Sequence, residues 1–133
     1  MKEVKRRLSN KIVFLIFLAI LICFEVYAIL IGNAYMWDTA VLIGLLVACL
    51  ALEKILDLHP AHYALFGIFL ILHNCGIFGW YDTYWLGIEF DTYVHFYFGL
   101  VSTLVISRTW DQWVPIKNNK LKYTSLIVII LGL

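Results

Sequence analysis

The side chains best suited to chemistry lie close together in one stretch, residues 73–99. Among them are two histidines, His73 and His95, and the aspartate Asp91. Imidazole and carboxylate groups can bind a divalent metal, pass protons, or act as a general acid–base pair. We therefore take His73, Asp91 and His95 as candidate catalytic residues, and the same three as candidate ligands of a divalent metal. Their types do not identify a reaction.

Spacing places two of these side chains on one helix face. Asp91 and His95 are four residues apart, so they stack on the same side of a helix, and the stripe continues to Gly99. Such a stripe of polar and small residues is typical of a face that packs against neighbouring helices rather than lipid. On the preceding segment, Gly76 permits close backbone approach near His73.

Structural roles compete with each chemical role. Asp91 is followed by a threonine, as Asp38 is, and an aspartate at a helix start commonly caps the backbone N–H groups. His73 and His95 could instead hydrogen-bond each other or a backbone carbonyl and so hold helices together. Two histidines and one aspartate are also a minimal set for catalytic zinc, and no His-x-x-x-His or His-Glu-x-x-His pair occurs in the sequence.

The composition is that of a membrane protein. Of the 133 residues, 63% are hydrophobic and 14% are charged, and the mean hydropathy is +0.89. An average globular domain is about 45–50% apolar and about 25% charged. The net charge of +1 predicts no nucleic-acid partner. Cys23, Cys49 and Cys75 lie singly in different apolar runs, so they indicate neither a disulfide framework nor a zinc knuckle.

Four apolar runs are long enough to cross a bilayer core of about 30 Å at about 1.5 Å per residue. The predicted spans cover about residues 12–32, 39–57, 61–80 and 91–108, and a partial span covers residues 124–133. That last run rises only about 15 Å, so we expect the chain to be cut short within a fifth helix. The predicted fold is an all-α, polytopic transmembrane helical bundle with four full spans and the start of a fifth, forming a single integral membrane domain over residues 1–133.

The distribution of positive charge predicts the orientation in the membrane. All ten Lys and Arg residues fall within residues 1–11, at Lys54, or within residues 108–122, whereas the connectors 33–38 and 81–90 contain none. Because Lys and Arg concentrate on the cytoplasmic side, we predict a multi-pass protein of the inner (plasma) membrane with a cytoplasmic N-terminus and the lipid bilayer as its partner. Aromatic residues gather at the outer boundary, as an interfacial belt would: Tyr35, Trp37, Trp80, Tyr81, Tyr84 and Trp85.

One further ionisable residue, Glu25, lies inside a predicted span. Counted from the outer ends of the spans with the helical rise, Glu25 and His73 lie about 10 Å deep and His95 about 6 Å deep. Ionisable groups inside a membrane are costly and usually face the bundle interior, so each of them is a functional candidate. Helices joined by short loops pack antiparallel, which would let these groups meet in the outer leaflet.

One combination of residues resembles a known family. It consists of His73-x-x-Gly76, an aromatic connector, and Phe90-Asp91-x-x-x-His95-Phe96-x-x-Gly99. This combination resembles the YjdF-like family of bacterial and archaeal inner-membrane proteins, whose function is not established. The resemblance implies a multi-span helical inner-membrane protein in which His73, Asp91 and His95 are motif residues.

The chain departs from that family's pattern at several positions. Members usually carry Arg-Asn shortly before the aspartate, an Arg directly after it, and a Gly-His pair after the first glycine. Ile88-Glu89, Thr92 and Ile77-Phe78 stand at those places here, so no role of those residues is carried over. A weaker similarity of the Asp-x-x-x-His-Phe element to VanZ-like membrane proteins suggests cell-envelope biology by analogy.

Three functions fit these features. The first is a membrane-embedded enzyme that acts on a lipid or envelope precursor from the outer leaflet, with His73, Asp91 and His95 sharing acid–base work or holding a metal. The second is a small proton-linked transporter in which Glu25 and His73 form a relay, although the inner halves of the first three spans are almost purely apolar. The third is a non-enzymatic membrane partner or assembly factor whose polar groups serve packing.

Overall fold

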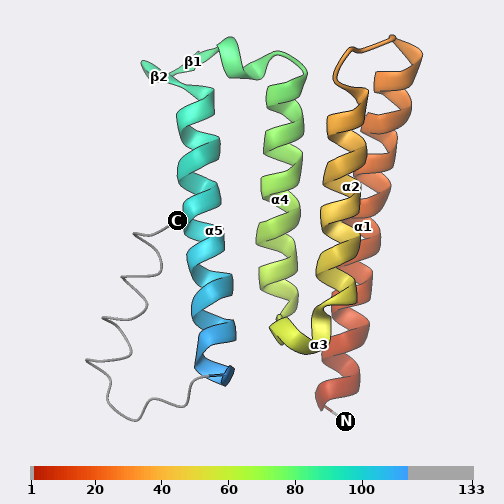
Figure 1. Cartoon of the computed structure of the whole chain (residues 1–133), viewed down its shortest axis with the longest axis vertical. Helices are drawn as coiled ribbons and strands as arrows, with labels where there is room; N and C mark the ends of the chain where they lie inside the picture. The colour runs from red at the N-terminus through yellow and green to blue at the C-terminus, as the bar shows by residue number, and fades with distance from the viewer. Residues whose placement is uncertain (1, 114–133) are drawn as a thin grey trace.

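The computed structural model describes residues 2–113, in which four long helices lie side by side and the chain reverses direction between successive ones (Figure 1). The helices are α1 (Lys2–Leu30), α2 (Met36–Ala51), α4 (Pro60–Ile77) and α5 (Phe90–Trp113), with the one-turn helix α3 (Glu53–Leu56) after α2. Between α4 and α5 come the 3-10 helix η1 (Trp80–Asp82) and the strands β1 (Tyr84–Trp85) and β2 (Ile88–Glu89). In this view the start of α1, α3 and the start of α4 lie at the lower end of the bundle, and the α1–α2 and α4–α5 connectors lie at its upper end.

α1 is a single helix of 29 residues that combines the charged N-terminal segment with the first apolar run. In its first turns, Arg7 donates a 2.6 Å hydrogen bond to Glu3, an i,i+4 pair that supports a helix modestly. The helix ends before Gly32, which has a positive φ of 64°, and the Asn33 N–H reaches back to the Ala28 carbonyl at 2.9 Å. A glycine in this conformation closes the helix and satisfies carbonyl groups that would otherwise lack partners.

The second apolar run forms two helices rather than the single predicted span 39–57. α2 has 16 residues and ends at Ala51, and the short helix α3 ends at Leu56 and is followed by Asp57, which adopts the left-handed conformation with a φ of 44°. Pro60 then begins α4, a position where a missing N–H removes no helical hydrogen bond. The helix of the predicted span 39–57 is therefore interrupted at Leu52 and followed by a turn at Asp57, and the crossing itself stays a prediction.

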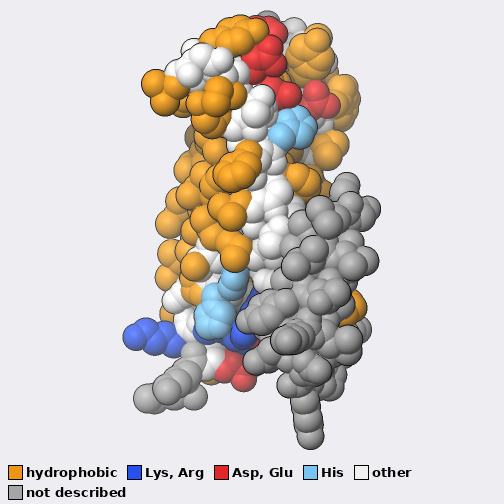
Figure 2. Space-filling view, turned by 90° about the vertical axis from the view of Figure 1, so that its left-hand side faces the viewer, with side chains coloured by type: hydrophobic (Ala, Val, Ile, Leu, Met, Phe, Trp, Pro, Cys, Tyr) orange, Lys and Arg blue, Asp and Glu red, His pale blue; other side chains and the backbone are white. Residues whose placement is uncertain are grey.

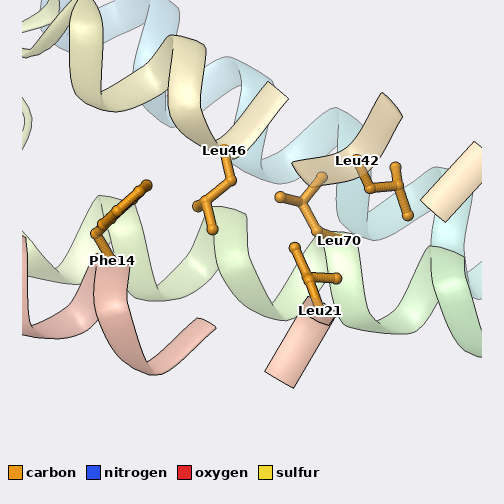
Figure 3. Close-up of a cluster of buried hydrophobic side chains, with 5 residues drawn as sticks. All are labelled: Phe14, Leu21, Leu42, Leu46 and Leu70. Carbon is orange, nitrogen blue, oxygen red and sulfur yellow. The ribbon is translucent and has the colours of Figure 1, made fainter. Parts of the chain in front are cut away.

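A hydrophobic core joins α1, α2 and α4. Its buried members are Phe14 and Leu21 of α1, Leu42 and Leu46 of α2, and Leu70 of α4 (Figure 3). α1 and α4 also come very close at Gly67, where a β-carbon would collide with the ring of Phe17. A small residue at a helix crossing lets two backbones approach and gain van der Waals contact, which is how helices associate in lipid.

α1 and α4 run in the same direction and keep one register along their length. Near the start of α1, Asn10 Nδ2 donates a 3.0 Å hydrogen bond to the carbonyl of Leu58, just before α4. About two turns farther along α1, the Phe17 ring lies against Gly67. Both helices consequently begin at the lower end of the bundle, and the same register brings Glu25 of α1 level with the upper part of α4.

α5 packs on α4, on the side away from α1 and α2 (Figure 1). The ring of Phe98 lies 4.9 Å from that of Phe69, measured between centroids. The Tyr97 hydroxyl donates a 3.1 Å hydrogen bond to the Leu65 carbonyl. α4 is therefore the central helix, and it contributes side chains to both of its neighbouring surfaces.

The α4–α5 connector folds back onto the start of α5. β1 and β2 form an antiparallel hairpin, whose turn residues Leu86 and Gly87 both have positive φ, as a tight two-residue hairpin turn requires. The Trp85 and Phe90 rings pack with centroids 5.0 Å apart, and the Tyr93 hydroxyl donates a 2.9 Å hydrogen bond to the Trp85 carbonyl. These contacts hold the aromatic connector over the upper end of the bundle.

Among the described residues, two helices are long and apolar enough to cross a membrane, Glu3–Leu30 and Pro60–Ile77, and Met36–Ala51 is a shorter apolar helix. The structure thus confirms a mostly helical fold, with one small hairpin in addition. The number of full spans stays a prediction. α5 continues to Trp113, beyond the predicted end at residue 108, and the partial span 124–133 lies outside the described residues.

Candidate functional site

The centre of the candidate site is a hydrogen bond between His73 of α4 and Tyr81 of η1. The Tyr81 hydroxyl and His73 Nδ1 share this bond, and the two rings meet edge to face with centroids 5.7 Å apart. A β-carbon on Gly76 would collide with the Tyr81 ring, so glycine at this position allows the tyrosine to lie against α4. A close backbone approach was predicted near His73, and the group that lies against Gly76 is instead the side-chain ring of Tyr81.

An open pocket of about 420 Å³ surrounds this pair at the upper end of the bundle. The start of α2, the end of α4 and η1 supply its lining residues: Tyr35, Asp38, His73, Gly76, Ile77, Gly79, Tyr81 and Asp82. The pocket thus combines one imidazole, two phenols and two carboxylates. A concave site with a few converging polar groups of these types is suited to proton transfer with a bound ligand.

Asp38 shares the pocket with the His73–Tyr81 pair, and the surroundings of the pair act on the Tyr81 hydroxyl. Burial raises the pKa of Tyr81 to about 12, with a smaller contribution from the negative charge of Asp91. Tyr81 therefore keeps its proton at neutral pH. When it donates this proton to His73 Nδ1, the neutral imidazole carries its own proton on Nε2.

Asp38 and Asp91 both lie inside their helices rather than in front of them. α2 begins at Met36 with Tyr35 as its N-cap and has no side-chain cap, so the prediction that Asp38 caps this helix is wrong. Asp91 is the second residue of α5. Carboxylates in a first helical turn still interact favourably with the positive end of the helix dipole, and the helical position of Asp38 brings it to the wall of the pocket.

Asp91 and His95 form a second pair on α5. His95 Nδ1 lies 3.2 Å from Asp91 Oδ1 and 3.0 Å from the Asp91 carbonyl oxygen, as their four-residue spacing predicts. The side chains are 73% exposed for His95 and 45% exposed for Asp91. On the face of the molecule that Figure 2 shows, histidine and acidic side chains lie close together near the upper end. His95 therefore projects from the described fold, whereas His73 lies in the pocket.

Within residues 2–113, no group of three or more His, Cys, Asp or Glu side chains is arranged to hold a metal ion. A catalytic zinc is usually held by three protein ligands. The fold brings His95 to Asp91 and His73 to Tyr81, and it does not gather His73, Asp91 and His95 into one ligand set.

A buried polar contact lies beside the pocket, between α2 and α4. Thr39 and Asn74 are fully buried, and the Thr39 hydroxyl donates a 2.7 Å hydrogen bond to Asn74 Oδ1. Asn74 Nδ2 has no partner among the described residues, and neither has the buried Oε2 of Glu25. Such atoms are rare in folded proteins. Glu25 thus turns one carboxylate oxygen into the interior at about the level of this contact.

The lower end of the bundle holds a charged network that was not among the predicted sites. Asp57 accepts hydrogen bonds from Arg6 at 2.6 Å and Arg108 at 2.8 Å, so one carboxylate links α1, α5 and the loop before α4. Burial alone would raise the pKa of Asp57, but the hydrogen bonds and charges of the two arginines outweigh it and hold the pKa below its usual value. The sequence did contain a signal for this network. Asp57 lies in a connector that was predicted to be on the same side of the membrane as the basic segments 1–11 and 108–122.

Tyr81 and Asp38 are the two pocket residues that sequence reasoning assigned elsewhere, the first to an aromatic belt and the second to a helix cap. Asp38 lies outside residues 73–99, and Tyr81 lies in the connector within them. Only the fold brings these two residues to His73. A signal for Tyr81 was present in Gly76, since a glycine one turn after a histidine leaves space for a nearby ring.

Long apolar helices and many exposed large apolar side chains define the class of protein as a helical membrane protein. Residues 9–133 match the family described as predicted membrane protein (DUF2238), and the chain belongs to this family. Comparison with curated proteins and with solved structures gave no match.

Proposed function

We propose that the chain is a YjdF-like, multi-pass inner-membrane protein in which α1, α2, α4 and α5 all cross the bilayer as one domain, with the N-terminus in the cytoplasm. The alternation of the connectors between the two ends of the bundle supports this topology (Figure 1). So does the charge distribution, because the described Lys and Arg residues lie within residues 2–11, at Lys54 and at Arg108.

Cysteine labelling tests this topology. In a background with Cys23, Cys49 and Cys75 replaced by serine, Asp82→Cys is expected to react with a membrane-impermeant maleimide in intact cells. Its matched partner, Lys54→Cys, is expected to react only after the membrane is permeabilised. Equal labelling of both positions in intact cells would contradict the proposed crossing by α4.

We further propose that the pocket around His73 is the acid–base site of a membrane-embedded enzyme that acts on a lipid or envelope precursor from the outer leaflet. The observation that carries this proposal is the hydrogen bond between His73 and Tyr81 inside a pocket that also presents Asp38. A hydrogen-bonded phenol fixes which ring nitrogen of His73 faces the ligand, and a nearby carboxylate stabilises the protonated ring.

Each candidate residue has a distinct role in this proposal. His73 gives the proton on Nε2 to the ligand when Tyr81 donates to Nδ1, and it takes a proton on Nε2 when Tyr81 accepts from Nδ1–H. In both cases Tyr81 positions the imidazole. Asp91 holds the ring of exposed His95 at 3.2 Å, and this pair exchanges protons between the outer surface and the pocket. A metal on His73, Asp91 and His95 is not part of the proposal, because no three-ligand group exists within residues 2–113.

Comparison of membrane lipids tests the enzymatic role without a known substrate. Host cells expressing equal amounts of the wild-type protein and of His73→Gln are compared by mass spectrometry of their lipids and envelope precursors. At least one species is expected to accumulate or disappear only with the wild type, and His62→Gln, on the same helix, serves as the matched control. If both variants reproduce the wild-type profile while His73→Gln only lowers thermal stability, the packing role of an assembly factor takes the place of the enzyme.

A proton-linked transporter is the second candidate, and the unpartnered atoms Glu25 Oε2 and Asn74 Nδ2 favour it. A buried carboxylate oxygen beside a buried polar contact is where a proton carrier would hold its proton. Purified protein in liposomes with an imposed pH gradient is expected to show a proton flux that Glu25→Gln abolishes. A flux that is absent, or that is unchanged by Glu25→Gln, would remove this candidate.

A further inference from the structure

A second pocket lies at the lower end of α1, and its charge is opposite to that of the His73 pocket. We name it the basal pocket; its volume is about 620 Å³, and it is lined by Glu3, Lys5, Arg6, Ser9, His59 and Pro60. The acidic Glu3 already accepts a hydrogen bond from Arg7 at 2.6 Å. The other charged side chains of the lining are basic, so the basal pocket is suited to an anion.

The positive potential in the basal pocket comes from side chains and from backbone. Lys5 is exposed and forms no ion pair with another described residue, and His59 is exposed on the opposite wall. Arg6 is fixed by its 2.6 Å contact with Asp57. Because α1 and α4 run in the same direction, their N-termini meet at this end, and each contributes the positive end of a helix dipole.

An apolar hollow continues from the basal pocket along the same flank of α1. Its volume is about 430 Å³, and it is lined by Ala19, Ile20, Cys23, Phe24 and Tyr27. Between the two lie Ile12 and Ile16, which are 52% and 54% exposed. Steps of three or four residues from Ser9 through these isoleucines to Ala19 follow one helix face. The rise from Ser9 to Ala19 is about 15 Å, half of the hydrocarbon thickness of about 30 Å.

We propose that the basal pocket and the apolar hollow together bind one anionic phospholipid. Its phosphate lies in the basal pocket between Lys5, Arg6 and His59, and one acyl chain follows the flank of α1 along Ile12 and Ile16 to the near end of the hollow at Ala19. Charge complementarity selects the headgroup, and the rise from Ser9 to Ala19 matches the depth of one leaflet. The site is separate from the His73 pocket, and it requires only that α1 lies in the membrane with its basic end at the surface.

Lipid titration of the purified full-length protein in detergent tests the proposal. Phosphatidylglycerol and phosphatidylcholine with identical acyl chains are compared by native mass spectrometry. Phosphatidylglycerol is expected to bind at least about fivefold more tightly. Lys5→Gln should weaken its binding about fivefold, since one basic residue near an anionic lipid contributes that order of affinity. Lys11→Gln removes the same charge from a different face of α1 and is expected to leave binding unchanged.

The acyl-chain part of the site has its own test. Ala19→Trp fills the hollow and is expected to weaken the binding of long-chain phosphatidylglycerol while leaving that of a short-chain form unchanged. Equal binding of both headgroups, or equal effects of Lys5→Gln and Lys11→Gln, would overturn the proposal. The proposal would also be overturned if glycerol phosphate, at the same concentration as the lipid, fully displaced phosphatidylglycerol. The ligand of the basal pocket would then be a soluble anion. None of these outcomes depends on His73, so they are distinguishable from failure of the enzymatic role.

Discussion

The two ends of the bundle use aspartate in opposite ways. At the lower end, Asp57 is held by two arginines at 2.6 Å and 2.8 Å. At the upper end, Asp38 lines an open pocket, and the segments 12–53 and 55–107, from which that end is built, contain no Lys or Arg. A carboxylate whose charge is already neutralised by fixed partners serves the fold. A carboxylate and an imidazole without such partners are available to a ligand.

The largest expected effect in this comparison comes from Asp57→Ala. It removes the acceptor of both arginines and leaves partly buried positive charges unpaired, so we expect the free energy of unfolding to fall by about 2–4 kcal/mol. Thermal unfolding of the purified protein in detergent measures the loss. Asp82→Ala, at an exposed position of the upper end, is the matched control and should change stability by less than about 0.5 kcal/mol. Equal losses in both variants would contradict the division between the two ends.

Acid should reproduce part of that loss in the wild-type protein. The lowered pKa of Asp57 means that the folded state binds its proton less readily than the unfolded chain does. The stabilisation is therefore complete above the usual aspartate pKa of about 3.9 and declines as the pH falls below it toward the folded-state value. Unfolding temperatures measured between about pH 5 and pH 3 should fall more steeply for the wild type than for Asp57→Asn. Parallel curves would show that other carboxylates dominate.

A smaller expected effect comes from Gly76→Ala at the upper end. The new methyl group must displace the Tyr81 ring, so the hydrogen bond to His73 is lost and stability falls by about 1–3 kcal/mol. Thermal unfolding gives the stability, and the NMR signal of the His73 ring reports the hydrogen bond. Gly99→Ala is the control, because a β-carbon there meets nothing within 4 Å. An unchanged His73 signal in Gly76→Ala would argue against the described packing of Tyr81.

The smallest expected change in stability belongs to Asp38→Asn. The side chain keeps its size and loses only a charge with no basic partner, so the free energy of unfolding should change by less than about 0.5 kcal/mol. The lipid profile of cells expressing it should nevertheless move toward that of His73→Gln, since Asp38 lines the same pocket as His73. A marked loss of stability with a wild-type lipid profile would assign Asp38 to the fold.

Features that depend on local spacing could be predicted from the sequence. The apolar runs indicated helices and a membrane protein, and the family match agrees with this class. The four-residue step from Asp91 to His95 predicted their contact, which the structure has at 3.2 Å. Gly76 predicted a close backbone approach near His73; a missing side chain does leave space there, but the ring of Tyr81 occupies it.

Features that depend on tertiary placement could not be predicted in this way. Tyr81 reaches His73 only because η1 folds back over the end of α4. Asp57 meets Arg6 and Arg108 across distances of about fifty residues in the chain. The end of α3 is set by a left-handed turn at Asp57, and aspartate adopts this conformation too rarely for the sequence to predict it.

The shortness of α2 has a mechanical consequence for the surrounding lipid. Its 16 residues rise about 24 Å, which is less than the hydrocarbon thickness of about 30 Å. If α2 crosses the bilayer as proposed, the membrane beside it must thin, or its ends must sit below the level of the neighbouring headgroups. Asp38 lies in the first turn of this helix. Hydrophobic mismatch at α2 would therefore place the part of the His73 pocket that α2 forms below the headgroup level of the leaflet. A lipid headgroup could then enter the pocket from the side of the membrane.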